Sequence, residues 1–416
     1  MTAGRVSKQR RVRHLAWALA LALPAAAAAA PDPADEAALQ ARALRLAQDA
    51  IIVDGHIDAP LHLQQKWTDP RAMPERQFDG QRARAGGLDA PFMSIYIPAR
   101  YQKEGGAKAL ADALIDTVER MAREAPEFFA LARSPADVRR NHAAGKISLP
   151  MGMENGAGLE GELANLDHFH ARGIRYITLT HAEPNRISDS SYSQERPHGG
   201  LSDFGRAVVA RMNALGIMVD VSHISDAAFF DVLEVSAAPV VATHSSARHF
   251  TPGWERNMSD EMIRALAAHG GLIMVNFGSG FLTEPAQKAY SAATAAIGAF
   301  MKAEGIGRFD DPRLQSYIAD YQREHPFPYA TIDDVIAHID HIVALTGIDH
   351  VGLGSDFDGL GDTLPVGLKS AADYPALVAA LLERGYTEAQ VRKILGENLL
   401  RLWSQVENAA AGEAPS

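Results

Sequence analysis

The sequence has 416 residues, of which 47% are hydrophobic and 22% charged, as in ordinary globular proteins with a large core. Its formal net charge of −11 gives no indication of nucleic acid or an anionic membrane surface as a partner. The absence of cysteine excludes disulfides, thiolate metal ligands, a cysteine nucleophile and a lipid anchor on an N-terminal cysteine.

Residues 1–30 have the pattern of a secretory signal peptide. Five basic residues and no acidic one accompany the apolar run LAWALALALPAAAAAA, and the segment PDPADE follows it. The run is short for a transmembrane helix, so we expect cleavage near Ala30; losing five positive charges changes the net charge from −11 to −16. The pair Arg10–Arg11 leaves Sec and twin-arginine export as alternatives. We therefore expect an exported, periplasmic, soluble protein without a stable membrane anchor.

Eight short apolar, β-branched runs are predicted to be strands. In chain order they are 50–58, 92–97, 147–155, 174–181, 217–223, 239–245, 271–277 and 350–357.

Helical patterns separate most of these strands and carry cap and stop residues. Ser202, Ser225, Ser259 and Thr331 are the expected N-caps, and glycines such as Gly216 are expected to end the helices. Strands that alternate with helices eight times predict a (β/α)₈ TIM barrel, with an open doubly wound sheet as the competing architecture. We expect a single barrel domain over residues 31–416, with residues 278–330 inserted after the seventh strand as part of a substrate lid.

Ligand-capable side chains lie at the carboxyl ends of these predicted strands, which meet at one rim of a barrel. They are His56, Asp58, Glu154, His181, His223, His244 and Asp356. Imidazole and carboxylate ligands without thiolate favour Zn²⁺, with Mn²⁺, Co²⁺ or Fe²⁺ as alternatives. The set is larger than one ion needs, which indicates two ions about 3.5–4 Å apart with a bridging carboxylate. Glu154 is the natural bridge because no lysine lies at a strand end.

The motifs that carry these residues resemble the membrane (renal) dipeptidase family of zinc peptidases. In order they are DGHID, GMENG, LTH, VDVSH, ATHSSAR, ERNMSDE, GLIMVNF, VGLGSDFDG and LGENLLRLW. The resemblance extends from about residue 48 to residue 405. It implies a metal-dependent-hydrolase barrel with two zinc ions, or Mn²⁺ or Co²⁺ as substitutes, that hydrolyses dipeptides by a metal-bridged hydroxide, including dipeptides with a C-terminal D-residue.

The resemblance also implies roles for individual residues. His56 and Asp58 would hold one zinc ion, His223 and His244 the other, and Glu154 would bridge them. His181 would contact the substrate or the tetrahedral intermediate. Arg256 would meet a substrate carboxylate or oxyanion, and Asp356 would shuttle the proton and meet the free amine. Relatives often form homodimers, so a homodimer is a further expectation.

Two departures from the family weaken parts of this interpretation. Some members carry tyrosines after the VNF strand that help to hold the substrate carboxylate, whereas this chain has Gly278 and Phe281 there. Vertebrate relatives are disulfide-linked and lipid-anchored, which the lack of cysteine and of an apolar C-terminal tail argues against here. Two alternatives stay open: an amidohydrolase that deacylates N-acyl amino acids or opens cyclic amides, and a non-catalytic periplasmic zinc- or peptide-binding protein.

Overall fold

The computed structural model describes residues 1–2, 33–308 and 311–412. The predicted signal peptide and its cleavage site therefore lie outside the described residues, apart from the first two residues of the chain. None of the helices in the described ranges is both long and apolar enough to cross a membrane.

Eight parallel strands form a closed barrel, which confirms the predicted (β/α)₈ fold. Neighbouring strands follow the order β1-β10-β9-β8-β7-β6-β5-β2, and β3 pairs with β4 in a separate two-stranded sheet. The strands are β1 (Ile52–Ile57), β2 (Leu88–Tyr96), β3 (Phe129–Leu131), β4 (Ile147–Leu149), β5 (Met151–Glu154), β6 (Ile174–Thr178), β7 (Met218–Asp220), β8 (Val241–Ala242), β9 (Leu272–Val275) and β10 (Val351–Leu353).

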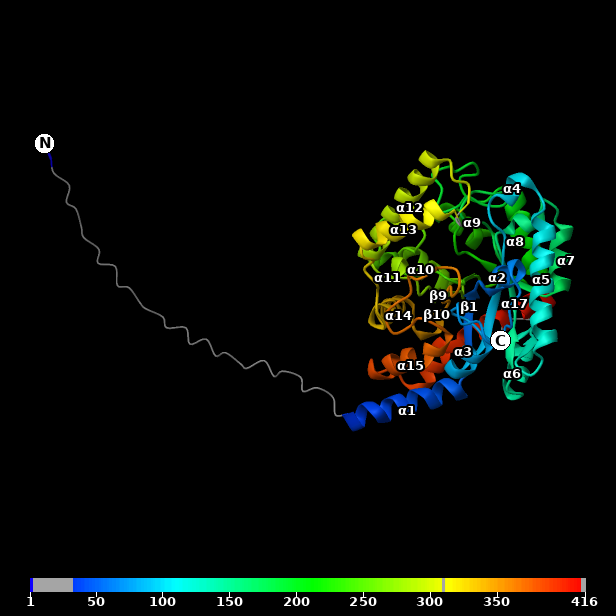
Figure 1. The fold of residues 1–416 in the computed structure, drawn as a ribbon, viewed down its shortest axis with the longest axis horizontal. Coiled ribbons are helices and arrows are strands. Elements are labelled where there is room, and N and C mark those ends of the chain that lie inside the picture. Colours follow the sequence, from blue (N-terminus) through cyan, green and yellow to red (C-terminus); the bar gives the residue numbers. More distant parts are fainter. Residues whose placement is uncertain (3–32, 309–310, 413–416) are drawn as a thin grey trace.

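Helices surround the barrel on the outside (Figure 1). The α-helices are α1 (Pro33–Asp49), α2 (Ala59–Gln65), α3 (Gly80–Gly86), α4 (Tyr101–Glu104), α5 (Ala107–Glu124), α6 (Pro135–Ala143), α7 (Ala164–Arg172), α8 (Asp203–Leu215), α9 (Asp226–Val235), α10 (Asp260–Ala268), α11 (Ser279–Leu282), α12 (Glu284–Glu304), α13 (Pro312–Glu324), α14 (Ile332–Thr346), α15 (Tyr374–Glu383), α16 (Glu388–Arg392) and α17 (Asn398–Ala411). Short 3₁₀ turns occur at η1 (Gly156–Leu159), η2 (Arg248–Phe250), η3 (Ile348–His350) and η4 (Ala371–Asp373), and η5 (Lys393–Glu397) is a π-helical turn.

The predicted helix caps are in place. The hydroxyls of Ser202, Ser225 and Ser259 each accept a backbone N–H from the first turn of α8, α9 and α10. Thr331 forms a capping box with Asp334 at the start of α14. Gly216 ends α8 with a φ of 74°, in the left-handed region that glycine adopts without strain.

One predicted strand, 147–155, is divided in two at Pro150. Proline has no N–H to donate to a strand ladder, and the chain changes partner at this residue. Before it, β4 pairs with β3; after it, β5 enters the barrel between β2 and β6.

An aromatic cluster and α17 fill one end of the barrel. Phe92 from β2 lies 5.3 Å from the ring of Trp403 and 5.2 Å from the ring of Tyr176. These side chains are fully buried, and they pack with Val53 at the start of β1. The amino ends of the strands are therefore sealed by apolar side chains, and the opposite end remains for polar groups.

A buried carboxylate joins the first and last strands of the barrel. Asp54 accepts the backbone N–H of His56 at 3.1 Å and that of Ser355 at 2.8 Å, and its other oxygen accepts the hydroxyl of Tyr374. Asp54 also pairs with Leu353 in the register between β1 and β10. Asp54 thus positions the ends of both strands.

The segment 278–330 contains α11, α12 and α13. In Figure 1, α12 and α13 lie together, coloured yellow, at the edge of the folded part of the chain, and the rings of Phe300 and Tyr317 stack between them at 4.1 Å. The segment therefore contains the helices expected of an insertion.

Candidate metal centre

The seven predicted strand-end residues converge on the open end of the barrel. His56 is the last residue but one of β1 and Glu154 ends β5, and the other five follow their strands within a few residues. His56, His223 and His244 are 0–5% exposed and Glu154 is 4% exposed, so water has little access to these side chains. The structure brings all seven together in three overlapping groups of three, two of which contain Glu154.

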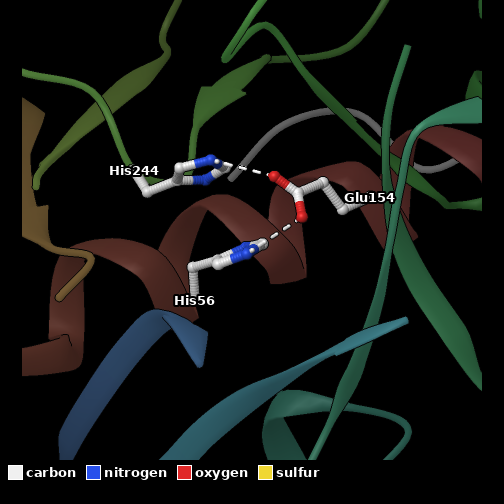
Figure 2. Close-up of side chains that lie close together, drawn as sticks. All are labelled: His56, Glu154 and His244. Atoms are coloured by element: carbon white, nitrogen blue, oxygen red, sulfur yellow. Dashed lines mark ion pairs between the residues drawn. The ribbon is translucent and has the colours of Figure 1, made fainter. Parts of the chain in front are cut away.

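Glu154 lies at the middle of the centre. Figure 2 shows its carboxylate between the rings of His56 and His244, with one oxygen toward each. Oε2 is 3.5 Å from Nε2 of His56, and Oε1 is 3.4 Å from Nε2 of His244. Oε1 is also 3.2 Å from Nε2 of His223 and 3.5 Å from Nε2 of His181. The two oxygens therefore face two different sets of ligand-capable groups.

The first set faces Oε2 of Glu154 and consists of His56 and the carboxylates of Asp58 and Asp356. Nε2 of His56 lies 3.5 Å from Oδ2 of Asp58, and Asp356 offers a ligand atom within 4.8 Å of those of both residues. Burial opposes the protonation of His56, yet the hydroxyl of Tyr176 and the carboxylate of Glu154 raise its pKa well above the ordinary value. The negative groups around His56 therefore stabilise a positive charge at this position, whether a proton or a metal ion carries it.

The second set contains the imidazoles of His223 and His244, whose Nε2 atoms are only 2.8 Å apart. Burial, with the neighbouring Arg256 for His223 and His56 for His244, lowers both pKa values well below the ordinary value, so both rings are neutral. Neutral imidazole is the form that binds metal. Nη2 of Arg256 lies 3.1 Å from the same Nε2 of His223 and can only donate, so this nitrogen carries no proton and has a lone pair that a metal ion could take in place of the guanidinium.

Unpaired buried atoms also fit a metal. Nε2 of His56 and Oδ1 of Asp58 are buried and have no hydrogen-bond partner. Buried polar atoms are almost always paired, so unpaired ligand atoms close together fit residues that bind a metal ion. Imidazole nitrogens and carboxylate oxygens are the donor set of zinc and related divalent ions.

Neighbouring residues fix which ring nitrogen faces the centre. Nδ1 of His56 lies 2.8 Å from the hydroxyl of Tyr176, which itself donates to the carbonyl of Gly55 at 3.1 Å. Nδ1 of His244 lies 2.8 Å from the hydroxyl of Thr243, which donates to Asp220 at 2.7 Å. Each hydroxyl has used its proton, so each Nδ1 is the donor and each Nε2 lone pair is free for a metal.

The backbone is strained at two of these residues. His223 has a φ of 69° and Asp356 a φ of 62°, in the left-handed region that side chains other than glycine rarely adopt. Such strain concentrates at functional sites, where the surrounding structure maintains it. Here it turns each side chain from the end of its strand toward the centre.

Asp356 is held by Asn276, whose side chain makes two hydrogen bonds. Nδ2 of Asn276 donates to its Oδ2 at 2.9 Å, and Oδ1 of Asn276 accepts the N–H of Gly278 at 2.7 Å. Burial raises the pKa of Asp356 to about 7, with Asp58 and Glu154 adding to the rise and His56 opposing it. The carboxyl group is thus able to gain and lose a proton near neutral pH.

Arg256 lies in the loop between β8 and α10 and is 2% exposed. Its Nη1 donates to the hydroxyl of Ser245 at 2.8 Å, and its Nη2 donates to the carbonyl of His244 at 2.8 Å. The guanidinium lies 5.0 Å from the centre of the Phe281 ring, within cation–π range. The positive charge is therefore fixed beside the second set of ligands.

A cavity of about 500 Å³ opens over this centre. Asp58, Glu154, His181, His223 and Asp356 form its floor, and its walls are mainly apolar and aromatic. The wall residues include Leu61, Tyr96, Tyr192, Trp254, Phe281, Tyr290, Thr294 and Leu360. A small polar molecule with apolar side chains fits such a lining.

Sequence reasoning missed the residues that orient the ligands. Tyr176, Thr243 and Asp220 were not singled out, because each looks like any other strand residue. Asn276, in the seventh predicted strand, donates to Asp356 in the structure. One signal was present: Gly152 lies opposite Tyr176 in the register, and a Cβ there would overlap its ring.

Comparisons with known proteins agree with this geometry. The family model described as membrane dipeptidase (peptidase family M19) matches residues 40–416. The probable dipeptidase PvdM from Pseudomonas aeruginosa is 28% identical with a TM-score of 0.77, covering 90% of this chain and 99% of its own. The dipeptidase AC, a metallopeptidase, is 29% identical with a TM-score of 0.70, covering 86% and 98%. A metallopeptidase from Rhodobacter sphaeroides, bound to a phosphinate mimic of the dipeptide L-Ala-D-Ala, is 28% identical with a TM-score of 0.70, covering 86% and 100%.

Proposed function

The chain belongs to the membrane dipeptidase family and is a metallo-dipeptidase, and we propose that it uses two zinc ions held by the strand-end residues. His56 and Asp58 would hold one ion, and His223 and His244 the other. Glu154 would contribute one oxygen to each. The observation that carries the proposal is the position of Glu154, whose two oxygens face the two sets separately.

Two divalent ions bound there would make an attacking water ionise near neutral pH and would polarise the scissile carbonyl. The residues of the chain prepare this chemistry in defined ways. Tyr176 and Thr243 keep the imidazole lone pairs directed inward. The aromatic walls reduce the number of waters that surround the reacting groups, which strengthens the electrostatic interactions there.

Asp356 is proposed as the proton carrier. Its side chain lies on the floor of the cavity next to the first set of ligands, and Asn276 holds its Oδ2. This leaves Oδ1 to accept a proton from the attacking water and to return it to the amine of the leaving residue. The same carboxylate would meet the free amine of the substrate.

Arg256 and His181 are proposed to contact the substrate. Arg256 carries a positive charge beside the second set, and its Nε is a buried donor without a partner, which would suit a carboxylate or a developing oxyanion. Burial lowers the pKa of His181, so its ring is neutral and able to donate one hydrogen bond to the tetrahedral intermediate. Gly278 and Phe281 add no hydroxyl after β9, so Arg256 would supply the main contact with the carboxylate.

The proposed substrates are dipeptides, including those with a C-terminal D-residue. The complex of the Rhodobacter sphaeroides metallopeptidase with a mimic of L-Ala-D-Ala supports this class. Phe281, Tyr290 and Thr294 from the 278–330 segment line the cavity, which supports the proposal that part of this segment serves as a lid. Export to the periplasm by residues 1–30 and assembly as a homodimer stay predictions.

The test is hydrolysis of L-Ala-D-Ala by the purified protein lacking residues 1–30, with zinc and with a chelator. Rapid release of alanine that the chelator abolishes is the expected result. N-acetyl-D-alanine is the control, because a dipeptidase needs the free amine and a deacylase does not. Hydrolysis of the acetylated compound alone would contradict the proposal. The substitution Asp356→Asn should leave both metals bound and remove most turnover, and near-normal kinetics would eliminate the proton carrier.

A further inference from the structure

A second group of ligand-capable side chains lies outside the barrel mouth. It consists of His249 in η2, Asp260 at the first position of α10 and His341 in α14. One ligand atom from each residue lies within 4.8 Å of those of the other two. None of these residues lines the cavity over the barrel centre.

The contacts within the group are close. Nε2 of His341 lies 2.8 Å from Oδ1 of Asp260. The rings of His249 and His341 stack with their centres 4.4 Å apart and an angle of 22° between their planes. His249 is exposed to solvent, whereas Asp260 and His341 are half-buried. To bind an ion, the exposed ring of His249 would turn from this stack and direct a nitrogen at the point shared by Nε2 of His341 and Oδ1 of Asp260.

We propose that His249, Asp260 and His341 bind one divalent transition-metal ion, separate from the ions of the barrel centre. Two imidazoles and one carboxylate form a ligand set that suits Zn²⁺ and its neighbours in the first transition row. The carboxylate would contribute negative charge that two neutral imidazoles lack. Solvent would complete the coordination on the exposed side of His249.

An ion at this site would affect the loop between β8 and α10. The loop between β8 and α10 carries both His249 and Arg256. One turn before His341, His338 already joins this loop to α11: its Nδ1 accepts the N–H of Ala247 at 3.1 Å, and its Nε2 donates to the carbonyl of Leu282 at 3.0 Å. An ion on His249, Asp260 and His341 would fasten the same loop to α10 and α14 from the outer side.

The test measures zinc directly rather than through activity. The purified enzyme with its barrel-centre metals in place is dialysed against increasing free Zn²⁺, and the ratio of zinc to protein is measured by elemental analysis. The wild type should bind one zinc ion more than the His249→Ala variant. Thermal unfolding gives a second readout: the melting temperature of the wild type should rise by about 3 °C at a hundredfold excess of zinc over its Kd. This rise should be absent in His249→Ala.

Two further variants separate metal binding from packing. His325→Ala removes another exposed histidine, at the end of α13, whose ring stacks on Tyr321 at 4.4 Å, and it should respond to zinc as the wild type does. Asp260→Asn keeps the size of the side chain but removes its charge, and it should weaken binding of the additional ion at least tenfold. Equal zinc content and equal thermal responses in the wild type and His249→Ala would overturn the proposal.

This inference does not depend on the proposed function. None of the three residues is assigned to the barrel centre, so His249→Ala should retain the dipeptidase activity of the wild type at low zinc. Additional zinc binding without hydrolysis of any dipeptide would contradict the proposed function alone.

Discussion

Replacing Asn276 tests whether the orientation of Asp356 matters for turnover. Asn276 is fully buried, donates to Oδ2 of Asp356 at 2.9 Å and accepts the N–H of Gly278 at 2.7 Å. The second bond fixes which end of the amide faces Asp356. Asn276→Ala removes both bonds, whereas Asn276→Asp keeps an acceptor for Gly278 and loses the donor to Asp356.

The size of the effect follows from the strength of one hydrogen bond to a charged group. Such a bond contributes about 1.5–3 kcal/mol. If the whole free energy of this bond serves to orient Asp356 in the transition state, losing the bond lowers kcat by about 10- to 150-fold, since 1.36 kcal/mol corresponds to tenfold. KM should change less, because Asn276 does not line the substrate cavity.

The assay is steady-state hydrolysis of L-Ala-D-Ala, with the metal content of each variant measured on the same sample. Both variants should retain the metals of the barrel centre and lose turnover. A loss confined to Asn276→Ala would assign the effect to the Gly278 bond and the shape of the loop. A kcat within threefold of the wild type in both variants, with full metal content, would refute the positioning of Asp356 by Asn276.

Three other substitutions test the centre and its surroundings. Glu154→Gln should reduce zinc content as well as activity, because a neutral amide cannot supply an anionic oxygen to each side, and full zinc occupancy would contradict the bridging role. Gly359→Ala should lower activity and metal content, since a Cβ there would overlap the carboxylates of Asp58 and Asp356; Gly298→Ala, at an exposed position of α12 with open space around it and no positive φ, is the matched control for kinetics. Burial lowers the pKa of His338 from 6.5 to about 4, so its contribution to stability is present above pH 6.5 and is lost as the pH falls toward 4. Between pH 7 and pH 5 this amounts to about 2 kcal/mol in the free energy of unfolding, and urea titrations of His338→Gln should show a smaller loss than the wild type over the same interval.

The order of strands and helices was readable from the sequence because the barrel strands are mainly apolar and several of the helices between them begin at a Ser or Thr cap. The two-stranded sheet of β3 and β4 was not readable from the sequence. Phe129–Leu131 has three residues, too few to show a periodic pattern, and its partner was merged with β5 into one predicted strand. The effect of Pro150 depends on which strands lie beside it, which is a property of the fold and not of the local sequence.

The convergence of the ligand-capable residues was predictable for a related reason. Parallel strands in a barrel end at one rim, so polar residues at strand ends are expected to meet whatever the exact register. The orienting residues depend on that register. Tyr176 reaches His56 across 120 positions of sequence, and Asp220 reaches Thr243 from the adjacent strand. Predicting such pairs requires the relative heights of the strands, which composition and spacing do not give.

The hydrogen bonds of Asp54 also have a consequence for how the protein is made. Ser355, which donates to Asp54, lies 301 positions later in the chain, and the ligand-capable Asp356 follows it directly. During synthesis from the amino terminus, His56 and Asp58 emerge long before the strand that completes their surroundings. Contacts so distant in sequence form late, because closing the intervening chain lowers its entropy. The barrel seam and the placement of Asp356 beside His56 and Asp58 therefore depend on the same late segment, and a chain that stops before β10 has neither.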